Sequence, residues 1–237
     1  MGGKSKKVKG TKQTLEYQEE PKKLHVKQLK CMNARQKEFV RSIENREITI
    51  CTGLAGSGKT YVSLAMALKM LEKNQIKQIV LVKSVTPLPE EEIGILPGDV
   101  YDKMLPFVMS FFGNIDKIIG PEMRKKLVGE EKIVIQPLAY VRGINIDEAC
   151  VILDEAQNLS VNVFKSIITR IGKGSKYIIM GDTEQVDMKH RERSVLSKLI
   201  KLFADDPVVG VVEFQPEDCV RNPIIPHLLD KIKEIEK

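Results

Sequence analysis

The residues best suited to chemistry lie between positions 53 and 60, which read Gly53-Leu-Ala-Gly-Ser-Gly-Lys-Thr60. This is the phosphate-loop pattern G-x-x-x-x-G-K-[ST]. In that pattern backbone N–H groups wrap around phosphates, and the helix that follows adds the partial positive charge of its N-terminus. Lys59 is expected to reach the β and γ phosphates, and Thr60 to hold Mg²⁺. The residues predicted to contact the nucleotide are Gly53, Leu54, Ala55, Gly56, Ser57, Gly58, Lys59 and Thr60.

A pair of carboxylates ends the apolar run Val151-Ile-Leu-Asp154-Glu155, which reads as a strand. We expect Asp154, at the carboxyl end of this strand and beside the phosphate loop, to hold Mg²⁺ through its waters. Side chains alternate along a strand, so Glu155 points differently and is predicted to take a proton from the attacking water. An Asp-Glu pair alone is also common in turns, and it is the phosphate loop that favours the catalytic interpretation.

A second apolar strand runs into polar residues at Gly181-Asp-Thr-Glu-Gln185. In an open parallel sheet the ligand lies beyond the carboxyl ends of the strands, so these side chains are expected to converge on the same crevice. We predict that Gln185 senses the γ-phosphate or orients water. The alternative is a turn rich in Gly and Asp without a catalytic role.

Strand and helix patterns alternate along the chain, which is typical of an α/β domain with a mostly parallel sheet and helices on both faces. Strands are predicted over 48–52, 78–83, 132–136, 150–154, 176–181 and 208–214. Helices are predicted over 34–45, 59–73, 99–112, 121–128, 160–171, 192–203 and 223–236. The aromatic residues of helix 99–112 are interpreted as a core stripe rather than a surface on which bases stack.

The charge is unevenly distributed. Residues 1–30 carry nine Lys and three Glu, which accounts for the whole net charge of +6. We expect these residues to form a flexible basic N-terminal arm, either a solubilising tail or a clamp on a phosphate backbone. The apolar runs are too short for a membrane span, and no secretory signal is recognised, so a cytoplasmic protein is expected. The Cys residues show no zinc or dithiol spacing and are interpreted as reduced thiols, mostly buried.

Taken in order, the motifs resemble the PhoH-like family of P-loop ATPases, relatives of the RecA-like core of superfamily 1 helicases. The resemblance covers about residues 30–235. Besides the phosphate loop it rests on Gly94-Ile-Leu-Pro-Gly-Asp99, Pro137-Leu-Ala-Tyr-Val-Arg142-Gly143, Leu153-Asp-Glu-Ala-Gln-Asn158, Gly181-Asp-Thr-Glu-Gln-Val-Asp187 and Val220-Arg-Asn-Pro223. It implies a single RecA-like P-loop NTPase domain over 31–237 that binds ATP with Mg²⁺ and hydrolyses it to ADP and phosphate.

The resemblance also implies roles for two residues outside the loop. Gln36 would contact adenine, although Asn33 and Gln36 also occupy the N-cap and N3 positions of a capping box. Arg221 would face the γ-phosphate, unless it is an ordinary surface arginine. Family members often show Arg-Pro where this chain has Lys83-Ser84, and this departure weakens a nucleic-acid role for that loop.

Helicase-like ATPases hydrolyse ATP between two RecA-like units, the second of which supplies an arginine. This chain has room for one unit, so either Arg221 acts in cis or a neighbouring subunit supplies an arginine in trans. We expect a homo-oligomer, with a hexameric ring favoured. The preferred function is an ATPase coupled to single-stranded RNA or DNA, as a helicase-like motor or remodeller. The alternatives are an ATP-dependent switch that binds a protein partner and, least favoured, a small-molecule kinase.

Overall fold

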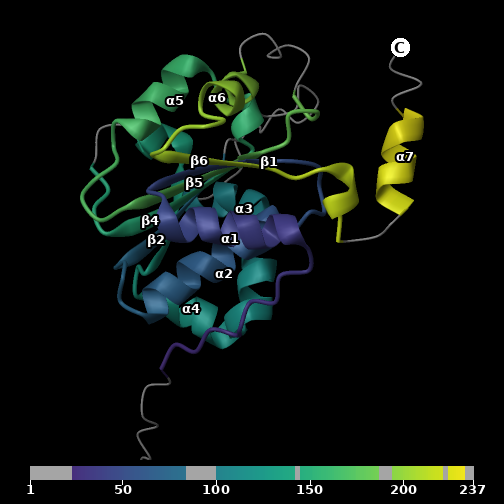
Figure 1. Cartoon of the computed structure of the whole chain (residues 1–237). Helices are drawn as coiled ribbons and strands as arrows, with labels where there is room; N and C mark the ends of the chain where they lie inside the picture. Colours follow the sequence, from purple (N-terminus) through teal and green to yellow (C-terminus); the bar gives the residue numbers. More distant parts are fainter. Residues whose placement is uncertain (1–22, 84–99, 142–144, 187–193, 221–223, 233–237) are drawn as a thin grey trace, which may run out of the picture.

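The computed structural model describes residues 23–83, 100–141, 145–186, 194–220 and 224–232 (Figure 1). The strands are β1 (Ile48–Thr52), β2 (Gln78–Lys83), β3 (Ile133–Pro137), β4 (Ala149–Asp154), β5 (Lys176–Gly181) and β6 (Val209–Glu213). The helices are α1 (Ala34–Asn45), α2 (Lys59–Glu72), α3 (Val100–Ile119), α4 (Pro121–Gly129), α5 (Val161–Ile168), α6 (Leu196–Leu202) and α7 (Ile224–Ile232). No helix in the described part of the chain is long and apolar enough to cross a membrane.

The strands form one sheet in the order β3-β2-β4-β5-β1-β6, and all the pairings between them are parallel. Their carboxyl ends are in register, since Lys83 pairs with Asp154 and Thr52 pairs with Gly181. The expected α/β class with a parallel sheet is therefore confirmed. No strand order was predicted; in the structure β5 lies between β1 and β4, so the carboxylate strand is not the direct neighbour of the phosphate-loop strand.

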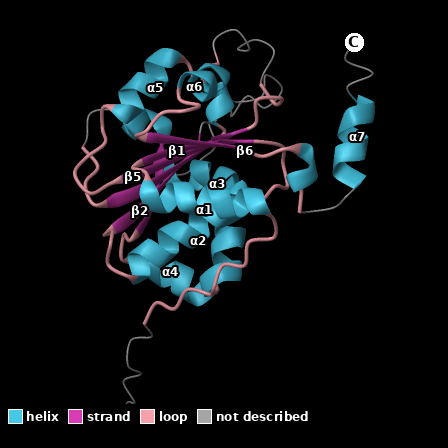
Figure 2. Ribbon diagram, in the orientation of Figure 1, coloured by secondary structure: helices cyan, strands magenta, loops and turns pink. Residues whose placement is uncertain are grey.

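Helices cover both faces of this sheet (Figure 2). Helices α1 to α4 lie on one face, where they share a core with strand residues such as Cys51, Leu81 and Ile152. Helices α5 and α6 lie on the other face and pack on the alternate residues, such as Ile50 and Val151. Because β4 is buried from Ala149 to Leu153, it forms the centre of the domain.

Helix α3 is longer than predicted, because it continues to Ile119 instead of ending at residue 112. The residues after that point keep the apolar face in register, and Ile115 and Ile118 are both buried. Gly113 does not interrupt the helix, and a side chain there would meet open space. The aromatic core stripe is confirmed for Phe111 and Phe112, which are buried; the side chains of Tyr101 and Phe107 lie outside the described part.

Residues 23–32 run as an extended segment over the helical layer formed by α1 to α4, and Figure 1 shows them beside α4. Val26 is buried in the core of that layer, and its backbone N–H donates to Glu72 Oε1 at 2.9 Å. Lys27 Nζ donates to the Lys117 carbonyl of α3 at 3.0 Å. Residues 23–30 are therefore packed on the domain rather than part of a free arm, and residues 1–22 lie outside the described chain.

The thiols follow the prediction only in part, because Cys51 and Cys150 are buried whereas Cys31 and Cys219 are partly exposed. All of these cysteines are free.

Candidate nucleotide-binding site

A cavity of about 610 Å³ opens at the carboxyl edge of the sheet. Its walls come from the loop after β1, the ends of β4 and β5, one side of α3 and the segments around Met32 and Val220. The residues that line it are Met32, Ala55, Gly56, Gly58, Lys59, Thr60, Tyr61, Ser110, Asn114, Lys117, Asp154, Glu155, Gly181, Asp182, Gln185 and Val220. A volume of this size is typical of sites for small ligands and cofactors.

The phosphate loop needs glycine at positions where the chain makes its closest approaches. Gly53 has φ +145°, and a Cβ there would lie 2.5 Å from Phe214 Cβ. Gly58 has φ +87°, and a Cβ there would lie 2.7 Å from Gln36 Nε2. Gly58 is also the N-cap of α2, and no described side chain caps that helix end. The first N–H groups of α2 therefore provide a site for an anion.

Lys59, the first residue of α2, folds back over the loop. Its Nζ donates to the Gly53 carbonyl, to the Leu54 carbonyl at 3.0 Å and to Ser57 Oγ at 3.3 Å. The ammonium group is therefore held at the mouth of the loop, and the side chain is partly exposed. Phosphate oxygens are stronger acceptors than these carbonyls and would compete for the same donors.

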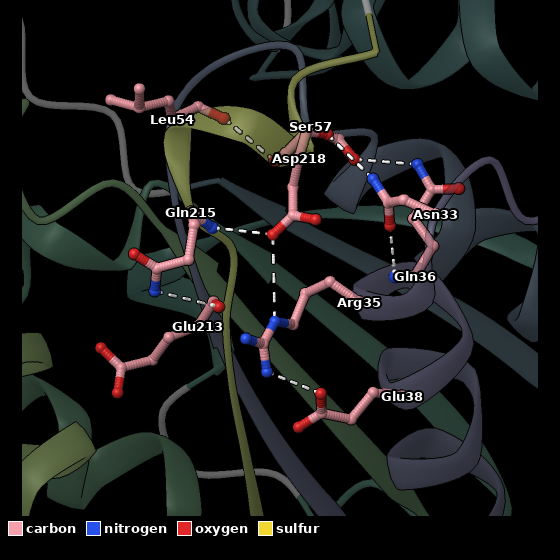
Figure 3. A network of polar contacts seen from close by, with 9 residues as sticks. All are labelled: Asn33, Arg35, Gln36, Glu38, Leu54, Ser57, Glu213, Gln215 and Asp218. Carbon is pink, nitrogen blue, oxygen red and sulfur yellow. Dashed lines mark hydrogen bonds and ion pairs between the residues drawn. The ribbon is translucent and has the colours of Figure 1, made fainter.

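Two segments far apart in sequence hold the loop from outside (Figure 3). On one side Gln36 Nε2 donates to the Ser57 carbonyl at 3.0 Å, while Gln36 Oε1 accepts from Met32 N at 2.8 Å. On the other side Val220 N donates to the Gly56 carbonyl at 3.0 Å.

The same two segments also bond to each other. Asn33 Nδ2 donates to the Asp218 carbonyl at 3.0 Å, and the carboxylate of Asp218 lies 3.9 Å from Arg35 Nε (Figure 3). The Asp218 carboxylate also accepts from Gln215 N at 2.9 Å. The loop is consequently fixed by residues that precede α1 and residues that follow β6.

The predicted cap of α1 is confirmed for Asn33, because its Oδ1 accepts from Gln36 N at 2.8 Å. The Gln36 side chain does not complete the capping box, since its Oε1 accepts from Met32 N instead. Gln36 is buried and is absent from the residues that line the cavity. Its contact with adenine therefore stays a prediction.

The carboxylate pair sits at a sharp turn. Asp154 ends β4, and its Oδ1 accepts from Glu155 N at 3.0 Å. Glu155 has φ +59°, a left-handed conformation that costs a residue with a side chain about 1–3 kcal/mol. The chain leaves the strand conformation at Glu155, and both residues line the cavity.

Gln157 connects this turn to the end of β5. Its Nε2 donates to Glu155 Oε2 at 2.7 Å, and its Oε1 accepts from Asp182 N at 3.1 Å. The side chain is buried, and it reaches β5 because Gly181 has no side chain. A Cβ at Gly181 would lie 2.7 Å from Gln157 Oε1. Gln157 was not predicted as a site residue, although it follows the carboxylate pair closely within the same motif.

Asp182 adds another carboxylate to the cavity wall. Its Oδ1 accepts from Glu184 N at 3.0 Å, whereas its Oδ2 is buried with no hydrogen-bond partner in the described structure. Burial raises the pKa of Asp182, and the backbone hydrogen bond and the positive charge of Lys59 oppose that rise. The Asp182 carboxyl therefore favours its neutral form more than an exposed aspartate does.

The donors present are those that a magnesium ion shared with a nucleotide requires. Mg²⁺ keeps several waters and is usually held by one or two protein oxygens together with phosphate oxygens. Thr60, which carries a hydroxyl, and Asp154, which carries a carboxylate, both line the cavity. No group of three or more His, Cys, Asp or Glu that could hold a metal occurs among the described residues, so a cage made of protein alone is absent there.

The structure thus brings together Lys59, Thr60, Asp154, Glu155 and Gln185 from three elements of the fold. Arg221, Arg142, Gly143, Asp187 and the Gly94–Asp99 motif lie outside the described residues.

Sequence reasoning did not identify several residues that line the cavity, among them Tyr61, Ser110, Asn114 and Lys117. The spacing of the last three, at i, i+4 and i+7, was the available signal, because it places polar residues on one side of the helix.

The sequence matches a known protein family. The family model described as PhoH-like protein matches residues 28–233. The chain belongs to the PhoH-like family. The PhoH-like protein of Bacillus subtilis is 32% identical over 215 residues, which cover 90% of this chain and 67% of the relative.

Two further members of the family show similar identities. The PhoH-like protein of Synechocystis sp. is 32% identical over 202 residues, which cover 85% of this chain and 61% of the relative. Protein PhoH of Escherichia coli K12 is 34% identical over 194 residues, which cover 81% of this chain and 54% of the relative. The chain therefore spans between about half and two thirds of the length of these members of the family.

Among solved structures, the large terminase of a thermophilic bacteriophage aligns with a TM-score of 0.47 and 10% identity, over 80% of this chain and 47% of the terminase. The replication initiator DnaA, bound to AMPPCP and single-stranded DNA, aligns with a TM-score of 0.32 and 14% identity, over 84% of this chain and 50% of DnaA. With TM-scores below 0.5, these likenesses support no functional conclusion.

Proposed function

We propose that this chain binds Mg·ATP in the cavity and hydrolyses it to ADP and phosphate. The supporting observation is that one cavity is lined by the phosphate-loop residues Lys59 and Thr60 and by the carboxylates Asp154 and Glu155 from a different strand. Lys59 would bind the β and γ phosphates, Thr60 and Asp154 would hold Mg²⁺, and Glu155 would accept a proton from the attacking water. Bound Mg²⁺ would neutralise negative charge on the phosphate oxygens.

Steady-state ATPase assays and nucleotide titrations of the wild type, Glu155→Gln and Lys59→Ala test this assignment. Glu155→Gln is expected to keep ATP affinity within about threefold while kcat falls by about 100-fold or more, because only the proton acceptor is lost. Lys59→Ala should weaken ATP binding itself. If Glu155→Gln lost binding and turnover equally, Glu155 would not be the base.

We further propose that hydrolysis is coupled to single-stranded RNA or DNA. The supporting observation is the concentration of lysine at the N-terminus, of which Lys23, Lys27 and Lys30 lie exposed on the packed segment. ATPase rates at one fixed salt concentration, with and without each polymer, test the coupling. A variant without residues 1–22 keeps Val26 in the core and loses the lysines that precede it. If those lysines contact phosphates, polymer binding by this variant should depend less steeply on salt concentration than binding by the wild type.

A second candidate is a switch that binds a protein partner. Helix α7 carries an exposed apolar stripe, Ile224, Leu228 and Ile232, with exposed fractions of 52%, 49% and 49%. Contiguous exposed apolar surface is a feature of sites that contact other proteins. Measurable hydrolysis that neither RNA nor DNA stimulates would favour this candidate over the motor.

ATP hydrolysis of this kind uses an arginine that stabilises the charge on the γ-phosphate. No arginine is among the described residues that line the cavity, whereas Val220, which bonds to the phosphate loop, directly precedes Arg221. We propose a homo-oligomeric ring, hexameric by preference, in which Arg221 faces a γ-phosphate. Co-expressed Lys59→Ala and Arg221→Ala subunits should regain activity if Arg221 acts on a neighbour's site. No recovery in mixed oligomers would place its action within its own subunit.

A further inference from the structure

The cavity is larger than a triphosphate requires, and part of its wall lies outside the phosphate loop and the carboxylate pair. That part consists of Met32, Tyr61, Ser110, Asn114, Lys117 and Val220. Tyr61 is the aromatic residue among the described lining, and Met32 and Val220 are exposed apolar residues. Apolar and aromatic surfaces beside a few polar groups are the walls that a nucleotide base needs, since its two faces stack and its edges hydrogen-bond.

The polar part of this wall belongs to α3. Ser110, Asn114 and Lys117 recur at helical spacing, so they lie on one side of the helix, opposite the buried side that contains Phe111 and Ile115. Asn114 Nδ2 donates to the Ser110 carbonyl at 2.8 Å, which uses one of the two amide hydrogens. An amide offers a donor and an acceptor together, the pattern that reads an adenine edge.

Gln36 is not among the residues that line the cavity. Its Oε1 accepts from Met32 N and its Nε2 donates to the Ser57 carbonyl, so the buried amide ties Met32 to the phosphate loop. A side chain whose amide groups bond to the protein's own backbone in this way can set the position of Met32 without touching a ligand. Gln36 therefore fits the role of a positioning residue.

We infer that the base and ribose of the nucleotide lie between two walls, one formed by Tyr61 and Met32 and the other by the polar side of α3. On the α3 wall, Asn114 contacts the base edge and Lys117 contacts the ribose or the α-phosphate. Gln36 acts through Met32. This inference rests on the proposed nucleotide binding and names its specificity-determining residues. It also gives a function to the part of α3 that continues past residue 112.

The experiment compares a ligand that has a base with one that has none. Dissociation constants of Mg·ADP and Mg·triphosphate are measured by calorimetry for the wild type, Tyr61→Ala and Asn114→Ala. Both variants are expected to weaken ADP binding by about tenfold or more while triphosphate binding stays within about twofold. Asn114→Ala should also reduce the preference for ADP over GDP. Tyr61→Phe, which keeps the ring, should bind ADP like the wild type.

Two controls make the result specific. Asn45→Ala is the matched variant, because Asn45 Nδ2 donates to the Arg41 carbonyl at 2.8 Å in the same helical geometry but away from this cavity. It should change neither constant, whereas Lys59→Ala should weaken both. Unchanged ADP binding in Tyr61→Ala and Asn114→Ala, or equal loss for both ligands, would overturn the inference. A wild-type protein that binds neither ligand would instead overturn the proposed function on which it rests.

Discussion

The contact between Gln157 and Glu155 gives a direct test of how the base is held. Gln157→Glu keeps the size and shape of the side chain, and its remaining oxygen can still accept from Asp182 N. The group that donates to Glu155 Oε2 at 2.7 Å is replaced by a carboxylate oxygen. The substitution therefore removes a charge-assisted hydrogen bond of about 1.5–3 kcal/mol and places two carboxyls in contact.

The size of the effect follows from that distance. Two unit charges separated by the 2.7 Å of this contact repel by about 6 kcal/mol at an effective dielectric constant of about 20. If the structure relaxes so that only a third of this repulsion remains, about 2 kcal/mol, that repulsion still raises the pKa of the carboxyl pair by about 1.5. The two carboxyls are then expected to share a proton up to a higher pH than a single carboxyl would, which makes the base unavailable over a wider acidic range.

The assay is the pH dependence of kcat. For Gln157→Glu the acidic limb should move upward by about one pH unit or more, so that kcat falls below that of the wild type along this limb and recovers as the pH rises above it. Gln157→Met, which has a similar volume and no charge, loses the hydrogen bond to Glu155 but adds no repulsion, so it should move that limb upward by less than Gln157→Glu does. Coincident acidic limbs for Gln157→Glu and the wild type would refute the idea that Gln157 orients the base.

Three other perturbations have defined outcomes. Gly58→Ala puts a Cβ 2.7 Å from Gln36 Nε2 at φ +87°, so it should lower the free energy of unfolding by about 1–3 kcal/mol and weaken nucleotide binding, as shown by urea titration and calorimetry. Burial raises the pKa of Asp182, so the folded state becomes less stable as the pH rises and this carboxyl ionises. Asp182→Asn cannot ionise, so in urea titrations it should be more stable than the wild type at about pH 7. That difference should disappear near about pH 4. Val26→Ala should cost about 1–2 kcal/mol, and a neutral result would mean that residues 23–30 do not belong to the folded domain.

Local sequence was sufficient for much of the site. The phosphate loop and the Asp154-Glu155 pair are contiguous motifs, and parallel strands bring their carboxyl ends together, so their meeting could be predicted. The strand order was less accessible, because a run of apolar residues does not say which neighbour it pairs with, and β5 between β1 and β4 was not anticipated.

The contacts that support the site escaped prediction for another reason. Gln157 reaches Asp182 across 25 residues of sequence, and the approach depends on the missing side chain of Gly181. Val26 gave no local signal either, because a few scattered apolar residues in a lysine-rich stretch show their packing role only in the context of the helices that they contact. Such contacts depend on tertiary geometry that the pattern of one segment does not contain.

The double attachment of the phosphate loop has a consequence for synthesis. Asn33 and Asp218, which hold the outer segments together, are 185 residues apart in the chain. A growing polypeptide presents the loop long before the residues that bond to Gly56 have left the ribosome. The central strands can pair earlier, but the loop cannot reach its final form until Val220 emerges. Nascent chains arrested before that point should therefore fail to retain ATP, whereas chains extended beyond it should acquire that ability in one late step.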